Sequence, residues 1–153
     1  MPKQSAGILL YRWVNDSFEV FLVHPGGPFF KNKDAGAWTI PKGEFEAEDP
    51  LAAAKREFKE ETGFEPDGDF LTLEPITQKG GKKVHAWALE GDIDGTKIVS
   101  NTFELEWPPK SGRVQHFPEI DKAEWFDEAS AEKKINPAQW ALVLQLKVLL
   151  NQD

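Results

Sequence analysis

The chain has 153 residues, of which 40% are hydrophobic and 29% are charged, and this balance suits one soluble globular domain over residues 1–153. Its 18 basic and 26 acidic residues give a net charge of -8, which does not favour a nucleic-acid partner because such partners require a basic surface. The chain has no cysteine, so disulfides, thiol catalysis and thiolate metal sites are excluded.

The first elements in chain order are two predicted strands. Apolar residues in 6–14 and 18–24 favour strands, and Asn15-Asp16-Ser17 favours a turn between them. The segment Pro25-Gly26-Gly27-Pro28 then interrupts any regular structure. A polar loop follows, and residues 37–40 form a short extended segment that Pro41 terminates.

A helix is predicted next, over residues 49–62. Asp49 is a suitable N-cap, Pro50 fits the first helical position, and Gly63 fits the position just after the last turn. Most residues between them are strong helix formers.

The C-terminal half contains more strand segments and late helices. Strands are predicted over 70–76, 83–90, 98–107 and 122–126, with Pro108-Pro109 ending the third. Asp127 is a candidate cap of a short helix, and Asn136-Pro137 predicts the start of a last helix that continues to about Asn151. Strands with one early and one or two late helices predict a mixed α/β sandwich.

Three glutamates share one face of the predicted helix over 49–62. Glu57, Glu60 and Glu61 are related by helical i, i+3 and i+4 spacings, and we expect them to face outward. Like charges at this spacing cost about 0.2–0.5 kcal/mol per pair, and a divalent cation would remove this repulsion. Arg56, four residues before Glu60, offsets part of the charge. Taken alone, this face also fits an ordinary solvated helix surface.

The residues around this face resemble the Nudix box, the pattern G-x5-E-x7-R-E-U-x-E-E-x-G-U in which U is a bulky apolar residue. The matching residues are Glu48, Arg56, Glu57, Phe58, Glu60, Glu61, Gly63 and Phe64, preceded by Pro41-Lys42-Gly43. The first strand, the Trp125-Phe126 pair and the C-terminal helix are also similar to the Nudix family. The resemblance implies a Nudix-like α/β/α sandwich with a mixed sheet.

One feature of the box, which spans residues 43–64, departs from the family. Only four residues separate Gly43 from Glu48, so the loop is one residue short. Glycine adopts backbone conformations that other residues resist, and we expect Gly43 to absorb the deletion with a positive φ. Whether the Gly43 carbonyl still reaches a metal is left open.

The resemblance implies a cofactor and a set of site residues. Mg²⁺ or Mn²⁺ would neutralise phosphate oxygens and activate water. The implied metal ligands are Gly43, Glu57, Glu60 and Glu61, and the implied catalytic residues are Glu48, Arg56, Glu60, Glu61 and Glu119. Lys42 is a candidate phosphate contact, with a plain surface lysine as the alternative. Glu119 is a candidate general base or ligand, with an ordinary loop acid as the alternative.

Other residue types give weaker indications. Phe29, Phe30, Trp38 and Trp87 are candidates for base stacking, although Trp38 alternates with Ile40 and fits core packing better. The three histidines, His24, His85 and His116, show no ligand spacing and are expected to be structural or surface residues.

The resemblance implies metal-dependent hydrolysis of a diphosphate linkage in a nucleoside diphosphate joined to another group. Nucleoside triphosphates and dinucleoside polyphosphates are the leading substrates, followed by ADP-ribose and nucleotide sugars. The alternatives are a non-catalytic Nudix domain that binds a nucleotide as a sensor or scaffold, and an unrelated acidic α/β domain. We expect a cytoplasmic monomer or homodimer with a small-molecule nucleotide as its partner and with neither nucleic acid nor membrane bound, since no segment is suited to a signal peptide or a membrane span.

Overall fold

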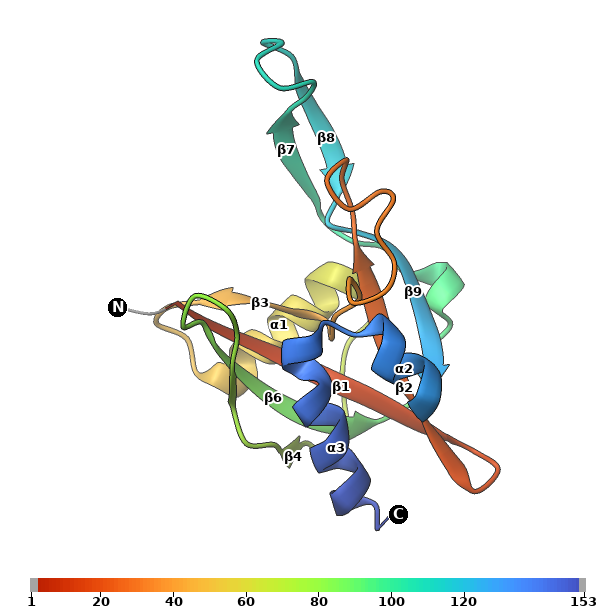
Figure 1. Ribbon diagram of the computed structural model, residues 1–153. Coiled ribbons are helices and arrows are strands. Elements are labelled where there is room, and N and C mark those ends of the chain that lie inside the picture. The colour runs from red at the N-terminus through yellow and green to blue at the C-terminus, as the bar shows by residue number, and fades with distance from the viewer. Residues whose placement is uncertain (1–2, 152–153) are drawn as a thin grey trace.

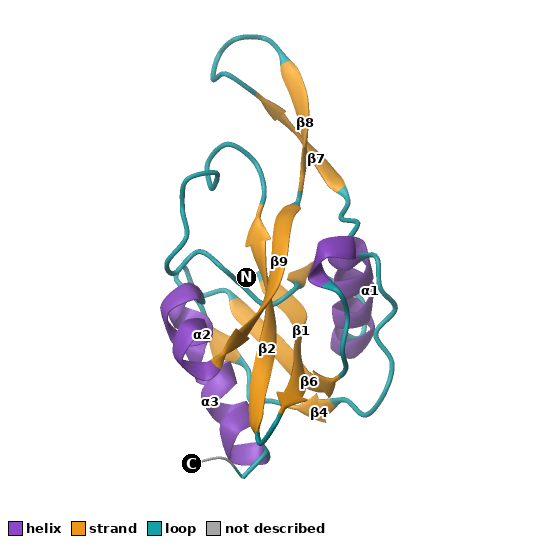
Figure 2. Ribbon diagram, turned by 90° about the vertical axis from the view of Figure 1, so that its right-hand side faces the viewer, coloured by secondary structure: helices purple, strands orange, loops and turns teal. Residues whose placement is uncertain are grey.

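A mixed β-sheet lies between helices in the computed structural model, which describes residues 3–151 (Figures 1 and 2). The ends of the expected domain, residues 1–2 and 152–153, lie outside the described residues. One face of the sheet is covered by α1 and the other by α2 and α3. This arrangement confirms the predicted mixed-sheet α/β/α sandwich.

Within residues 3–151, seven strands form the main sheet, in the order β4-β6-β1-β2-β9, with β3 paired to β1 and β5 paired to β6. Their bounds are β1 Gln4–Val14, β2 Ser17–Pro25, β3 Lys42–Phe45, β4 Leu71–Thr72, β5 Ile76–Thr77, β6 Lys83–Glu90 and β9 Ile120–Asp127. Strands β1 and β6 run parallel, while β1 pairs antiparallel with both β2 and β3. The sheet is therefore mixed, as expected.

Side chains of the central strand β1 alternate between two hydrophobic clusters. Ile8 packs in the cluster that contains Phe58 of α1, whereas Leu9 packs in the cluster that contains Leu142 of α3. Helix bounds are α1 Pro50–Thr62, α2 Glu128–Lys134 and α3 Trp140–Leu149, with 3₁₀ turns η1 Gly95–Lys97 and η2 Pro137–Gln139. Because both faces of β1 are covered, its residues 6–11 are continuously apolar rather than alternating.

A second, two-stranded sheet projects from the body (Figures 1 and 2). It consists of β7 Thr102–Glu106 and β8 Val114–Pro118, paired antiparallel so that Phe103 lies opposite Phe117. We refer to residues 102–118 as the hairpin. The prediction of a strand over 98–107 was too long, and β8 was not predicted because Gln115 and His116 give it little strand character.

Other element boundaries differ from the predictions in instructive ways. The helix predicted before Gly63 and the strand over 83–90 are confirmed, and Asp127 caps α2 as expected. The strand predicted over 70–76 is divided into β4 and β5, which lie on either side of Pro75, a residue with no N–H to donate to a sheet. The last helix starts as the turn η2, and α3 begins only at Trp140. No helix within residues 3–151 is both long and apolar enough to cross a membrane.

Candidate functional site

Helix α1 is fixed at both ends by the residues that the sequence indicated. The Asp49 carboxylate accepts a hydrogen bond from the Ala52 N–H at 3.1 Å, which satisfies one free donor of the first turn. Gly63 adopts the left-handed conformation at φ 82°, and its N–H donates to the Lys59 carbonyl at 2.7 Å. Ala54 and Phe58 anchor the helix to the sheet, so the opposite side chains have defined positions.

Arg56 connects three glutamates of the motif. Its Nε and Nη2 donate to the two Glu48 carboxylate oxygens at 2.9 Å and 2.5 Å. Its Nη1 donates to Glu57 at 2.8 Å and to Glu60 at 3.1 Å. The hydrogen bond from Arg56 lowers the pKa of Glu48, and the Glu48 carboxylate in turn raises the pKa of Arg56. Arg56 therefore neutralises part of the helix charge in this structure.

Glu57 lies against β3 at Gly43. A Cβ atom on Gly43 would fall 2.0 Å from the Glu57 carboxylate, a distance that no side chain tolerates. Only glycine therefore allows Glu57 to take this position. Gly43 is not among the glycines with positive φ, so the expectation of a positive φ was wrong. It lies in the extended strand β3, and its role is to permit close approach rather than an unusual turn.

Glu61 lies one turn further along α1 and contacts the same strand. Its Oε1 accepts a hydrogen bond from the Lys42 N–H at 3.2 Å. Burial raises the pKa of Glu61 to about 8, and the nearby carboxylates of Glu57 and Glu119 act in the same direction. Burial also raises the pKa of Glu57, which is only 9% exposed. The prediction that these side chains face outward was therefore wrong for Glu57 and Glu61, which turn toward β3.

Glu119 approaches this site from the other side. It lies between β8 and β9, where its N–H donates to the Asn101 carbonyl and its carbonyl accepts from the Gly26 N–H, both at 2.8 Å. Burial raises the pKa of its carboxyl group, with Glu60 adding to the shift. Glu119 lines one cavity of about 480 Å³ together with residues of α1, β3 and neighbouring segments. The other lining residues are Pro25, Gly26, Lys42, Gly43, Glu44, Glu57, Glu61, Lys82 and Phe103.

Two larger hollows lie elsewhere, but they gather fewer residues of the motif. One of about 700 Å³ contains Glu48 and Arg56 without Glu57 or Glu61, and one of about 650 Å³ surrounds Arg12 and Trp125. The chemistry-bearing side chains converge in the smaller cavity, which we call the carboxylate cavity. Glu48 and Glu60 stay outside its lining, held by Arg56.

The residues around the carboxylate cavity fit a hard divalent cation. Across residues 3–151 no three acidic or histidine side chains are grouped as metal ligands, and Arg56 donates hydrogen bonds to Glu57 and Glu60 while the Lys42 N–H donates to Glu61. Yet the donors are all oxygens, as Mg²⁺ and Mn²⁺ prefer. The absence of a Cβ at Gly43 also lets the Glu57 carboxylate lie against the β3 backbone at the cavity wall.

The structure also locates residues to which the sequence assigned either no role or two alternative roles. Lys42 is half-buried rather than a plain surface lysine, and burial lowers its pKa, with Lys82 adding to the shift. Lys82 and Phe103 were not singled out from the sequence, although Phe103 alternates with Leu105 and Trp107 as a strand residue would. Trp38 is 2% exposed and packs in the core, as expected.

Two of the histidines have clear structural contacts. His24 is fully buried between the Asp121 carboxylate at 2.8 Å and the Lys33 carbonyl at 2.6 Å. His85 contacts the Gln4 side chain at 2.7 Å. Neither lines the carboxylate cavity, in agreement with the expectation of structural or surface roles.

The fold and the carboxylate helix together define the class of this protein. The chain belongs to the NUDIX family, since the NUDIX domain matches residues 1–146. Most members of this family are pyrophosphohydrolases and typically use a divalent metal. No curated protein matches the sequence.

Solved structures share the fold at low sequence identity. A Caenorhabditis elegans Ap4A hydrolase in a binary complex is similar with a TM-score of 0.63 and 24% identity, over 97% of this chain and 98% of that one. The NUDIX domain of Shewanella oneidensis NrtR complexed with ADP ribose gives 0.64 and 14%, over 98% and 89%. MutT, from a study of Aliivibrio salmonicida and Vibrio cholerae, gives 0.56 and 17%, over 95% and 96%. At these identities the likeness establishes the fold.

Proposed function

We propose that this protein hydrolyses a diphosphate linkage in a nucleoside diphosphate joined to another group, with Mg²⁺ or Mn²⁺ as cofactor. The observation that carries the proposal is the convergence of Glu57 and Glu61 from α1 with Glu119 from the β8–β9 junction on one cavity. Nucleoside triphosphates and dinucleoside polyphosphates are the leading substrates. The similarity of the fold to Ap4A hydrolase and MutT supports this choice.

Each side chain of the site has a role in the proposed reaction. Glu57, Glu60 and Glu61, with the Gly43 carbonyl, would hold the cation, which supplies charge neutralisation and a more acidic water molecule. Arg56 orients Glu48, Glu57 and Glu60 through the hydrogen bonds described above. Lys42, which lines the cavity, would contact a phosphate oxygen.

Glu119 is the proposed base. It would accept a proton from water as the water oxygen bonds to phosphorus and the bridging P–O bond breaks toward the leaving phosphate. Its raised pKa, caused by burial, brings its proton affinity closer to that useful near neutral pH. Glu119→Gln should therefore lower kcat by about 100-fold, within the range for loss of a general base, with little change in melting temperature.

A substrate panel tests the proposed function. The purified chain is incubated with nucleoside triphosphates, dinucleoside polyphosphates, ADP-ribose and nucleotide sugars in Mg²⁺ or Mn²⁺, and the products are separated by chromatography. We expect cleavage between phosphates that stops when the metal is chelated. Glu65→Gln is a matched control, because Glu65 lies beyond α1 and pairs with Lys59. Tight nucleotide binding without any cleavage would instead support a sensor or scaffold domain.

A further inference from the structure

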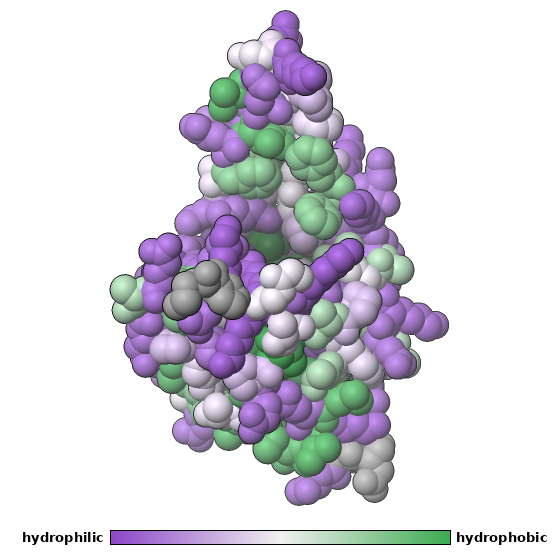
Figure 3. Space-filling model, turned by 60° about the vertical axis from the view of Figure 1, so that its left-hand side comes forward, coloured by the Kyte–Doolittle hydropathy of each residue, from purple (hydrophilic) through white to green (hydrophobic). Residues whose placement is uncertain are grey.

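One side of the hairpin carries most of its apolar side chains, with Gln115 opposite Leu105 as the polar exception. Phe103 and Leu105 of β7 alternate with polar residues, Trp107 follows directly after the strand at the same spacing, and Phe117 lies opposite Phe103, so all four side chains share one face of the ribbon. They are all partly buried, whereas Thr102, Glu104 and Glu106 on the other face are exposed. In the space-filling view, apolar side chains gather on this projecting part of the molecule (Figure 3).

The loop over residues 26–37 packs against this apolar face. Gly27 has φ +95°, and a Cβ there would lie 2.8 Å from the tip of the Phe103 ring, so the backbone touches the ring directly. Further along, the Phe29 and Trp107 ring centroids are 5.4 Å apart with an interplanar angle of 80°. Phe29 remains 60% exposed. The two rings thus form a corner that is open to solvent, which we call the aromatic corner.

Phe103 connects the face that carries the aromatic corner to the carboxylate cavity. Phe103 lines that cavity together with Glu57, Glu61 and Glu119. Trp107 follows Phe103 by four residues on the same face, which corresponds to about 13 Å along an antiparallel strand. A ligand with phosphates at the carboxylates and a flat group at the aromatic corner would follow this wall.

The tip of the hairpin is held in place by its own hydrogen bonds. The Glu106 carboxylate accepts from the N–H groups of Lys110 at 3.1 Å and Gly112 at 3.2 Å. The Gln115 side chain donates to the Trp107 carbonyl at 2.7 Å. Trp107 is therefore positioned before any ligand arrives, which reduces the entropy lost on binding.

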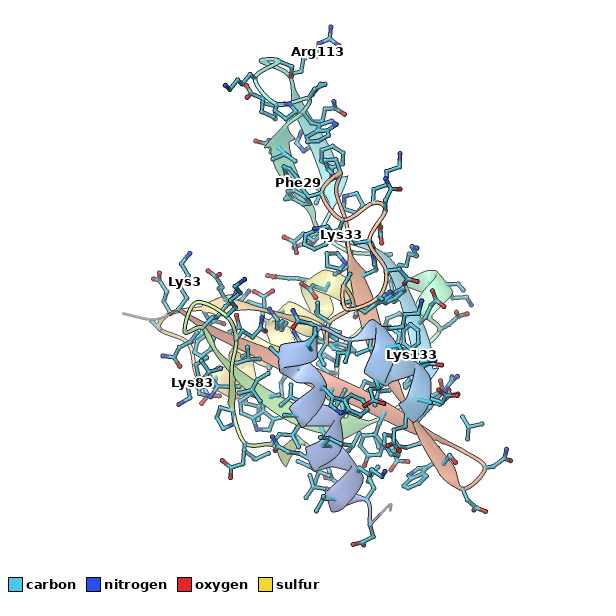
Figure 4. The ribbon with its side chains drawn as sticks, in the orientation of Figure 1. Lys3, Phe29, Lys33, Lys83, Arg113 and Lys133 are labelled. Carbon is cyan, nitrogen blue, oxygen red and sulfur yellow. The ribbon has the colours of Figure 1, made fainter. Side chains whose placement is uncertain are left out.

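Basic side chains occur on both segments that form the aromatic corner, in an otherwise acidic protein. Lys31 and Lys33 come from the loop, and Lys110 and Arg113 from the hairpin tip, in a chain with net charge -8. Figure 4 shows Phe29 beside the hairpin, Lys33 on the same loop and Arg113 at the tip. This charge distribution favours an anionic ligand over a second copy of the acidic chain.

We propose that the aromatic corner of Phe29 and Trp107 is the nucleobase subsite of the enzyme, with Phe103 leading from it to the carboxylate cavity. The inference rests on the proposed function, since it assumes a nucleotide substrate whose phosphates occupy that cavity. Aromatic side chains stack on any nucleobase because every base has a π-face. The corner therefore selects for the presence of a base rather than for one particular base.

Binding to a nucleotide and to a phosphate chain without a base tests this inference. The full chain is titrated with ADP and with inorganic diphosphate in Mg²⁺, followed by calorimetry and by the NMR signal of the Trp107 indole N–H. We expect ADP to move the indole signal and diphosphate to leave it in place. Phe29→Ala should weaken ADP binding by about 10-fold, within the range of base–aromatic stacking, and leave diphosphate binding unchanged.

Two variants and one further measurement complete the test. Phe29→Trp keeps a stacking surface and should bind ADP as the native chain does, and Trp13→Ala, an exposed aromatic at the far end of β1, should have no effect. If Phe29→Ala lost ADP binding and diphosphate binding equally, the proposed subsite would be overturned. It would also be overturned if sedimentation showed that the native chain is a dimer and that the Phe29→Ala variant is a monomer. A base-dependent response without any hydrolysis of the substrate panel would refute the proposed function alone.

Discussion

Helix α1 with strand β3 and the hairpin with its facing loop are both required by the proposed reaction, but they are built differently. In the first region Phe58 is packed into the core, and Arg56 and the Lys42 N–H donate to the Glu57 and Glu61 carboxylates, which lie against β3. In the second region the apolar side chains of the hairpin are only partly buried, Phe29 is exposed, and local hydrogen bonds hold the tip. The comparison suggests that phosphate chemistry depends on core packing, whereas base recognition depends on a surface extension that can change independently.

The strongest test of this comparison is the effect of two phenylalanine substitutions on the free energy of unfolding. Phe58 is 1% exposed beneath α1, so Phe58→Ala should lower the free energy of unfolding by about 3–5 kcal/mol. Phe29→Ala, at a position 60% exposed, should change it by less than about 0.5 kcal/mol. Urea unfolding measures both. Similar losses for the two variants would show that the hairpin region is part of the cooperative core.

The carboxylates of α1 should affect catalysis without affecting the fold. Glu57→Gln or Glu61→Gln should lower kcat by about 100-fold or more, the scale of losing one strong electrostatic stabiliser. Circular dichroism should be unchanged, because glutamine has nearly the same shape. Steady-state kinetics at limiting metal, with Glu65→Gln as the control, makes the measurement. Near-normal turnover in both variants would exclude Glu57 and Glu61 from the metal site.

Metal binding should stabilise the α1 region. At a metal concentration about 100 times its Kd, Mg²⁺ or Mn²⁺ should add about 2.7 kcal/mol to the free energy of unfolding and raise the melting temperature by several degrees. Replacing Glu60 and Glu61 together by glutamine should abolish this shift. A thermal shift that persists in the double variant would place the metal elsewhere. Arg113→Gln in the hairpin tip should leave the shift unchanged.

The smallest predicted effect is the pH dependence of the metal-free protein. Burial raises the pKa of Glu61 to about 8 in the folded chain, so between pH 5 and 8 the unfolded chain releases a proton that the folded chain retains. Stability should therefore fall as pH rises through this window. Urea unfolding with a chelator at pH 5 and 8 measures the difference.

Glu61→Gln isolates the Glu61 contribution from those of Glu57 and Glu119, whose pKa values are also raised by burial. In that variant the fall in stability should be smaller than in the native chain. A native protein that becomes more stable toward pH 8 without metal would contradict the burial of the Glu61 carboxyl group.

The sequence by itself determined the features that depend on local geometry. Asp49, Pro50 and Gly63 defined the ends of α1, because caps act on the nearest turn of backbone. The whole box around Glu57, Glu60 and Glu61 was also sufficient to recognise the family, and the order of strands and helices was sufficient for its fold class. These properties are set by residues within a few positions of one another.

Only the tertiary structure decided how the site is assembled. Glu57 and Glu61 turn toward β3 because Gly43 leaves space and the Lys42 N–H supplies a hydrogen bond, and both contacts come from a strand that the sequence did not predict. Glu119 and Phe103 join the same cavity through the pairing of distant segments. The direction and burial of these side chains depend on such long-range contacts. The periodicity of one segment does not show which distant segment will pack against it.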